Sequence, residues 1–279
     1  MNVGYEERMK VSATKSLRVL ILAVLSLWGL SEVANAATFD SVPHIHHIKV
    51  VEKKVLVLTH EGLYELAGKN NMKLIGKDKI DVMGLTSLGK VLVASGHPAQ
   101  GSKMPNPIGL VRSTDGGSSW KAVSLVGKVD FHSLEGAGSE LYGADSQSGN
   151  LLYSADTGKT WRSLGTNTFT DIAVSPDMPE MAVALKDSKL LLTEDAFKST
   201  KELKNNFKFT QVEWRNSGLY ALSGNTLYKS LDTGKTWTKL STFKGETGIL
   251  SASNQLMLVT VGADIYTSAN SGKSFKQIS

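Results

Sequence analysis

Three observations predict an all-β fold in the form of a six-bladed β-propeller. One short stretch recurs at a nearly fixed spacing, short alternating strands lie between turn residues, and no helical periodicity of useful length follows residue 36. A repeat period of about 40 residues is typical of propellers, in which each repeat is a small sheet that needs neighbours to bury its faces.

The recurring stretch reads STDGGSSW, SADTGKTW and SLDTGKTW in its three best copies, and TEDAFKST and SANSGKSF are divergent copies. Its Asp position falls at residues 115, 156, 195, 232 and 270 (Asn in the last), so the steps are 41, 39, 37 and 38 residues. Asp and Ser bond backbone N–H groups in tight turns, Gly supplies positive φ, and Trp offers a large packing surface. We expect structural, non-catalytic roles for Ser113, Asp115, Gly117, Trp120, Ser154, Asp156, Gly158, Trp161, Ser230, Asp232, Gly234 and Trp237.

The pattern Ser-x-Asp-x-Gly-x-Thr-Trp resembles the Asp-box, or BNR repeat, of sialidase-type propellers. The stretches HIHHIKV, LTHEGLYEL, IDVMGL, ASGHP, NPIGLVRSTDGGSSW and DFHSL resemble a group of secreted bacterial Asp-box proteins that are labelled glycosyl hydrolases. More distantly, the repeats resemble the sortilin propeller and photosystem II stability factors, which are binding proteins. The resemblance implies the propeller fold and export.

The first 36 residues have the order of a secretory signal. A basic polar segment precedes the apolar run 19–30, and small residues follow up to Ala36, where we expect cleavage. Residues 37–279 would then form one propeller domain of a secreted or periplasmic protein. The alternative is an uncleaved membrane anchor, but an apolar run of 12 residues is shorter than the ~20 that span a bilayer. We expect no stable membrane insertion after cleavage.

Composition narrows the classes of partner. The chain has no Cys, which excludes thiolate metal sites, disulfides and a lipoprotein anchor at the cleavage site. The net charge is +5, and the Lys residues are spread along the chain without a basic cluster among aromatic residues. Nucleic-acid binding is therefore not supported. We expect a monomer with a glycan or protein ligand.

The chain after the signal divides into six blades of four strands each. Strand signals are short β-branched or alternating runs between Gly, Asn, Asp and Ser turns. Blade two carries an insertion, HPAQGSKMPNP, between its second and third strands, and the role of residues 37–43 in closing the ring stays open. The predicted blades span residues 44–76, 79–125, 129–166, 168–206, 207–241 and 243–279.

One face of this propeller is predicted to collect histidines and carboxylates. The starts of the innermost strands and the loops between second and third strands open on the same face, opposite the Asp-box turns. Five of the six histidines map there, in blades one to three. Strand alternation places His44 and His46 on one side, and His47 on the other. The ligand or metal candidates are His44, His46, His60, His97, His132, Asp81 and Asp130.

Two interpretations of this face stay open. Histidine with carboxylate is the ligand set of Zn or Cu(II) sites, which predicts three or more imidazoles converging on one ion. A glycosidase would instead need two carboxylates about 5–9.5 Å apart, for which Asp81, Asp130, Asp145 and Glu61 are candidates. Each residue taken alone could also be an ordinary hydrogen-bonded group at a loop.

A sialidase is not expected. The resemblance implies three arginines around the channel, because guanidinium groups bind a sugar carboxylate bidentately. Only Arg112, Arg162 and Arg215 follow the signal segment, and the first two lie beside Asp-box residues. We therefore expect a binding or assembly protein with a His/Asp-rich, metal-binding pocket at the channel mouth. The alternative is a polysaccharide-directed glycosyl hydrolase that uses paired carboxylates.

Overall fold

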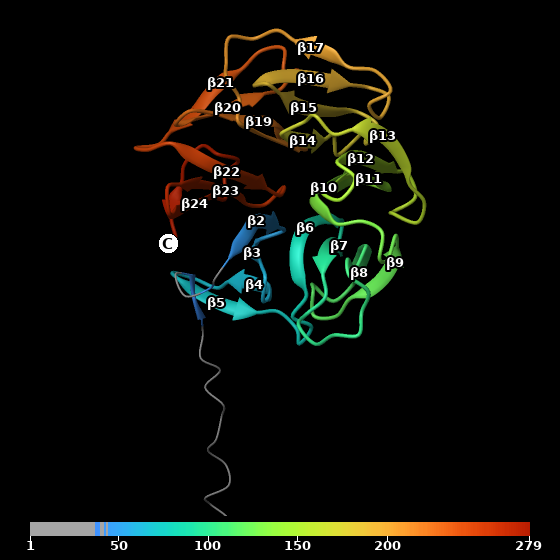
Figure 1. Cartoon of the computed structure of the whole chain (residues 1–279). Helices are drawn as coiled ribbons and strands as arrows, with labels where there is room; N and C mark the ends of the chain where they lie inside the picture. Colours follow the sequence, from blue (N-terminus) through green and yellow to red (C-terminus); the bar gives the residue numbers. More distant parts are fainter. Residues whose placement is uncertain (1–36, 40–41, 43) are drawn as a thin grey trace, which may run out of the picture. The chain divides into compact units, whose positions relative to one another are not determined.

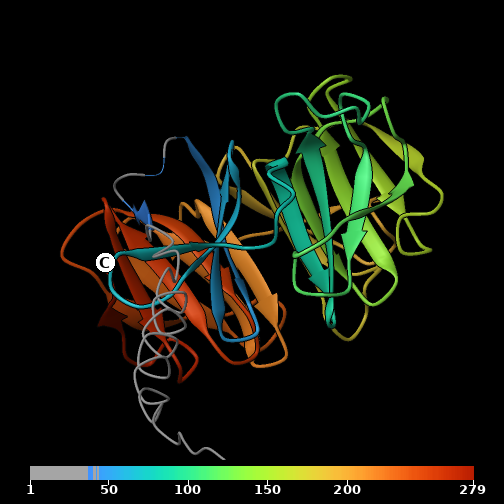
Figure 2. The same cartoon turned by 90° about the horizontal axis from the view of Figure 1, so that it is seen from below.

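The computed structural model describes residues 37–39, 42 and 44–279. The predicted signal segment lies outside the described residues. The described part forms six antiparallel sheets arranged in a ring, without an α-helix (Figure 1), and the twist of the blades is visible in Figure 2. The predicted six-bladed all-β propeller is confirmed. No helix of the described residues is long and apolar enough to cross a membrane.

Each blade consists of four consecutive strands that run from the centre of the ring outward. Blade one contains β2 (Ile45–Val51), β3 (Lys54–Thr59), β4 (Gly62–Leu66) and β5 (Asn71–Leu74). Blade two contains β6 (Asp81–Leu88), β7 (Val91–His97), β8 (Leu110–Ser113) and β9 (Lys121–Ser124). Blade three contains β10 (Phe131–Ala137), β11 (Glu140–Asp145), β12 (Asn150–Ser154) and β13 (Arg162–Thr166).

The other three blades follow the same plan, and the predicted blade boundaries differ from the ends of the sheets by at most four residues. Blade four contains β14 (Asp171–Val174), β15 (Ala182–Lys186), β16 (Lys189–Thr193) and β17 (Lys201–Leu203). Blade five contains β18 (Gln211–Arg215), β19 (Gly218–Ser223), β20 (Thr226–Ser230) and β21 (Thr238–Thr242). Blade six contains β22 (Thr247–Ala252), β23 (Met257–Val261), β24 (Asp264–Ser268) and β25 (Lys276–Gln277).

The ring closes by packing between blades one and six, without a shared sheet. The strand β1 (Ala37–Thr38) pairs with β5 and adds a fifth, outer strand to blade one. Among the described residues, blade six consists of its own four strands. The two blades meet where the Val50 N–H donates to Ser251 Oγ at 2.9 Å, and where Leu258 and Ile265 join the core of blade one. Ala37 and Thr38 therefore pair with blade one.

The Asp-box turns are held by their own side chains, as predicted. In the copy around Asp156, the Ser154 hydroxyl donates to Asp156 Oδ1 at 2.8 Å and accepts the Gly158 N–H at 2.9 Å. Hydrogen bonds from Thr160 and Ser154 lower the pKa of Asp156 to about 2. Gly158 has a φ of +84°, and a Cβ there would lie 2.1 Å from Leu110 Cδ2, so glycine is favoured at this position.

Candidate metal-binding site

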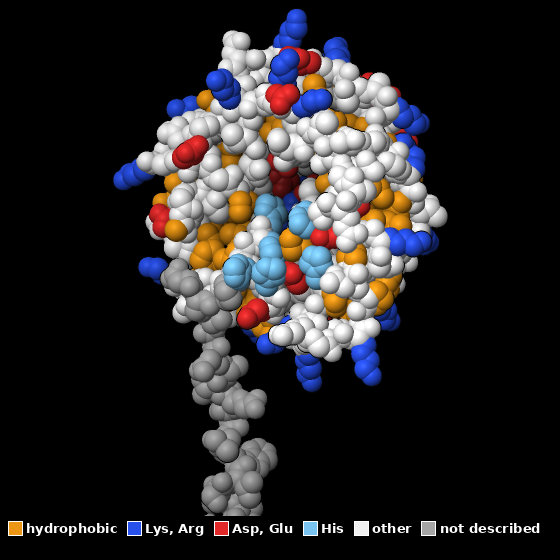
Figure 3. All heavy atoms as spheres, in the orientation of Figure 1, with side chains coloured by type: hydrophobic (Ala, Val, Ile, Leu, Met, Phe, Trp, Pro, Cys, Tyr) orange, Lys and Arg blue, Asp and Glu red, His pale blue; other side chains and the backbone are white. Residues whose placement is uncertain are grey.

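Two His/Asp clusters lie at one mouth of the central channel. Figure 3 shows the histidine side chains gathered around this opening, on the face that Figure 1 presents. These histidines lie on or next to the innermost strands and at the loops between the second and third strands of blades one to three. The Asp-box turns lie at the opposite ends of the strands. The predicted grouping of histidines on one face is therefore observed. They form two groups of two imidazoles and one carboxylate, where one pocket with three imidazoles was predicted.

Cluster one consists of His46, His60 and Asp81, and it joins blade one to blade two. His46 Nε2 lies 2.8 Å from Asp81 Oδ1, and His60 Nδ1 lies 2.7 Å from Asp81 Oδ2. Each carboxylate oxygen of Asp81 thus has its own imidazole partner. The three ligand atoms lie within 4.8 Å of one another, close enough to share one ion.

Cluster two consists of His97, Asp130 and His132, and it joins blade two to blade three. Asp130 Oδ2 lies 2.8 Å from His132 Nε2 and 3.3 Å from His97 Nε2, and it also accepts the Ser146 hydroxyl at 2.8 Å. The Asp130 side chain is 4% exposed. Its second oxygen, Oδ1, is buried without a hydrogen-bond partner among the described residues.

The insertion in blade two orients His97. Asn106, near the end of this loop, places its Oδ1 2.8 Å from His97 Nδ1. Because an amide oxygen only accepts, His97 Nδ1 carries the hydrogen, and in the neutral ring Nε2 presents a lone pair. His97 Nε2 lies 3.3 Å from Asp130 Oδ2, so this nitrogen faces the carboxylate.

The two clusters are neighbours because of the strand register. Asp81 of cluster one and His97 of cluster two are directly opposite each other in the β6–β7 ladder. Residues paired in this way have Cβ atoms about 4.5–5.5 Å apart. One hairpin of blade two therefore supplies a ligand to each cluster.

On the first strand, one candidate ligand lies outside both clusters, and the predicted alternation of side chains is wrong. His44 lies before β2 with a φ of +55°, and its ring contacts His60 at 5.2 Å between centroids without joining either cluster. A β-bulge between Ile45 and His47 breaks the alternation, so His46 and His47 both line the central cavity. Burial, with a smaller effect from Lys49, lowers the pKa of His47 to about 3, which keeps that imidazole neutral.

The other two candidate carboxylates are not members of either cluster. Asp145 accepts two backbone N–H groups: Oδ1 accepts that of Asp130 at 2.9 Å, and Oδ2 accepts that of Ser148, in the following turn, at 3.0 Å. Burial alone would raise the pKa of Asp145, but hydrogen bonds, those from Ser148 foremost, lower it. Glu61 is exposed at the turn between β3 and β4.

A polar cavity of about 180 Å³ continues from the clusters along the axis of the ring. His46 and His132, one from each cluster, line it together with charged residues of the inner strands. Lys49 pairs with Glu135 in its wall. A second ion pair joins Arg215 to Glu213 at 2.8 Å between Nη2 and Oε2.

Asp171, on β14, is the acid of this cavity without an ion pair among the described residues. Its Oδ2 accepts the Val212 N–H at 2.8 Å. Burial raises the pKa of Asp171 to about 7, against the opposing effect of the Val212 hydrogen bond. Burial also raises the pKa of Glu213, although Arg215 and Lys49 oppose this shift.

Sequence reasoning missed several residues of this region. Asn106 and Ser146 contact the clusters, but they occur in polar loops where nothing marks them out. Lys49 and Asp171 lie on inner strands, and a polar residue within a strand that should face the axis is a signal that could have found them.

No protein-family model and no curated protein sequence matches the chain. Solved structures resemble it in fold. YCF48 bound to D1 peptide superposes with a TM-score of 0.52 at 16% identity, over 85% of this chain and 82% of that one. A chain of a nidogen/laminin complex gives 0.55 at 12% identity, over 81% of this chain and 92% of that one.

An enzyme shares the same architecture. The GH74 xyloglucanase from Xanthomonas campestris gives a TM-score of 0.54 at 12% identity, over 84% of this chain. The chain spans 45% of that enzyme's length. The chain is thus a six-bladed β-propeller with Asp-box turns, similar in fold, at low identity, to propellers of binding proteins and of GH74 enzymes.

Proposed function

We propose that this protein is an exported binding or assembly protein whose His/Asp face holds divalent Zn or Cu and uses the bound ion to engage a glycan or protein partner. Cluster two is the principal ion site, and cluster one is a weaker second site. The order of residues 1–36 supports export. The structural neighbours that bind a peptide or laminin support a binding role for the fold.

The observation that carries the proposal is the state of Asp130. A carboxylate that is 4% exposed has one oxygen without a partner among the described residues, and its other oxygen is shared by His97, His132 and Ser146. Burying a charge in this way is costly unless a cation or a donor completes the site. A metal ion held by His97, Asp130 and His132 would compensate this buried charge.

Cluster one is expected to bind more weakly, because it is already satisfied. Each oxygen of Asp81 has an imidazole nitrogen within 2.8 Å. An ion entering this cluster must replace those contacts. The gain from coordination is therefore smaller than in cluster two.

The ligand types select the class of ion and leave room for a partner. Imidazole nitrogens with one carboxylate suit Zn and Cu(II), and a hard cation such as Ca²⁺ would prefer an all-oxygen shell. Three protein ligands leave at least one position of a tetrahedral ion open. A side chain or sugar oxygen of the partner could fill that position.

The hydrolase interpretation has less support. Asp81 and Asp130 each contact two imidazoles, and both oxygens of Asp145 accept backbone N–H groups. None of these is an open carboxylate of the kind that a glycosidase places beside the scissile bond. The likeness to a xyloglucanase is one of fold.

The proposal is tested by metal analysis of protein purified without a histidine tag or a chelator. We expect one tightly held Zn or Cu per chain by mass spectrometry, and its loss in the double variant His97→Ala, His132→Ala. His44→Ala is the matched control, because this imidazole lies on the same face outside both clusters. Wild-type protein that contains no metal and cannot be loaded with Zn²⁺ or Cu²⁺ would refute the proposal.

Asn106 is expected to position the His97 ligand. Replacing Asn106 by Leu removes the acceptor for His97 Nδ1–H and should weaken Zn²⁺ binding about 10–100-fold, the usual cost of losing such a partner. Asn106→Asp retains an acceptor and should bind Zn²⁺ at least as well as wild type. Competition with a chromophoric chelator measures both affinities. Equal affinities for the Leu and Asp variants would contradict this role.

A further inference from the structure

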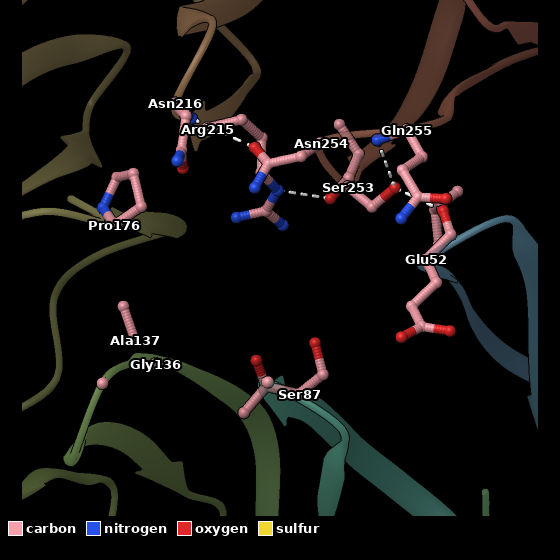
Figure 4. Close-up of a pocket in the computed structure, with 15 residues that line it drawn as sticks. Glu52, Ser87, Gly136, Ala137, Pro176, Arg215, Asn216, Ser253, Asn254 and Gln255 are labelled. Atoms are coloured by element: carbon pink, nitrogen blue, oxygen red, sulfur yellow. Dashed lines mark hydrogen bonds between the residues drawn. The ribbon is translucent and has the colours of Figure 1, made fainter.

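A second cavity lies at the opposite end of the inner strands from the His/Asp clusters. It has a volume of about 270 Å³, just below the ~300–1,000 Å³ of common ligand pockets. The hairpin ends of all six blades contribute to it, including Glu52 before β3, Ser87 on β6, Pro176 after β14 and Asn254 before β23. Figure 4 shows these side chains arranged around one open space.

Arg215 is the fixed cation of this cavity. Its Nε donates to the Ala252 carbonyl, Nη1 donates to the Trp214 carbonyl at 2.7 Å, and Nη2 pairs with Glu213. These contacts hold the guanidinium plane and use three of its five N–H groups. The side chain is still 26% exposed, and Figure 4 shows the guanidinium directed into the cavity.

Glu52 supplies a negative group on the same cavity. It follows β2, and its backbone carbonyl accepts the Ser253 hydroxyl of blade six, which fixes its position. Its carboxylate has no ion pair within 4.0 Å among the described residues, although Figure 4 shows it directed into the same open space as Arg215. The two opposite charges are thus held apart across the cavity.

The rest of the lining is made of small hydrogen-bonding groups. Ser87, Asn216, Asn254 and Gln255 provide hydroxyls and amides, and none of the described residues that line the cavity is aromatic. Sugar rings usually stack on aromatic side chains, so this cavity lacks a feature of a glycan site. The size of the cavity and its separated positive and negative side chains suit a small hydrophilic molecule that carries one negative and one positive group.

We propose that this cavity binds a small zwitterion, a free amino acid or a short peptide. Its carboxylate is held by Arg215 and the amides of Asn216 and Asn254, and its ammonium group by Glu52. This site is separate from the metal face and does not depend on it. The two clusters and the cavity lie at opposite ends of the inner strands, as the positions of Asp81 and Ser87 on β6 show.

The test is a titration of ¹⁵N-labelled protein, followed by two-dimensional NMR, in the presence of EDTA. The probes are glycine, glycylglycine, acetate and methylammonium. We expect one of the two zwitterions to shift the amide signals of Asn216, Asn254 and Gln255, with an affinity at least about threefold above acetate and methylammonium. Tighter binding of glycine would identify the ligand as a free amino acid, and tighter binding of glycylglycine would identify it as a short peptide.

The variant Glu52→Gln isolates the second charge without disturbing the fold, because its carboxylate is exposed. We expect it to weaken zwitterion binding about three- to fivefold, the size of an exposed ion pair, and to leave acetate unchanged. Glu61→Gln, on the other face, should change nothing. The proposal is overturned if zwitterions bind no better than acetate, or if Glu52→Gln binds them like wild type. Because EDTA is present, neither result bears on the metal face.

Discussion

Replacing Asp130 by Asn is expected to weaken metal binding more than about 100-fold while leaving the metal-free protein at least as stable as wild type. The carboxylate is the only anionic ligand of cluster two, so its loss removes most of the attraction for a divalent ion. In the absence of metal, the same change removes a buried charge with one unpartnered oxygen. The amide oxygen can still accept from His132 and Ser146.

Two measurements check this result. Isothermal titration with Zn²⁺ gives the affinity, and urea unfolding in EDTA gives the free energy of unfolding. Wild type should gain about 2.7 kcal/mol when the free ion is at 100 times its dissociation constant, and the variant should gain almost nothing. Asp78→Asn is the control with the same change of charge at an exposed position. A variant that unfolds far more easily than wild type in EDTA would mean that Asp130 is a structural residue.

The fold could be predicted from the sequence because the signal is local. An Asp-box turn is held by bonds within eight residues, so each copy carries its own evidence, and the spacing of the copies then gives the number of blades. Even the divergent copy around Asp195 keeps the pattern: Thr193 Oγ1 accepts the Phe197 N–H at 2.9 Å. Phe197 occupies the glycine position with a φ of +59° and packs on Tyr142 and Phe169. Aromatic contacts there compensate for the unfavourable backbone conformation.

The site could be predicted only in part, because its geometry depends on register. The face that carries the histidines follows from topology alone. The division into two clusters follows from the pairing of Asp81 with His97, which no local pattern reveals. The bulge at His47 reverses one side chain, and a bulge of one residue leaves no mark in the sequence. Asn106 reaches His97 through an irregular loop, whose path the sequence does not specify.

The central cavity leads to a prediction about pH. Asp171 has a pKa of about 7 in the folded protein, against an ordinary value of 3.8, because burial penalises its charged form. Between pH 3.8 and about pH 7, the Asp171 carboxyl is therefore protonated in the folded protein and ionised in the unfolded chain. The contribution of Asp171 to the free energy of unfolding is fully present below pH 3.8, and it is lost as the pH rises through 7. The groups around it are Lys49 on β2, Glu135 on β10 and Glu213 on β18, of which only Lys49 favours the charge.

Asp171→Asn is therefore expected to stabilise the protein by about 2–4 kcal/mol at pH 8.5 and to have little effect at pH 4.5. The amide oxygen can keep the hydrogen bond from the Val212 N–H, and the neutral side chain no longer adds a third negative charge to the cavity. Urea unfolding of both proteins across this pH range, in EDTA, measures the difference. Asp177→Asn, exposed on the same blade, controls for the change in net charge. A difference that stays constant with pH would show that Asp171 titrates in the folded protein as it does in the unfolded chain, and that the acids of the cavity are screened by water.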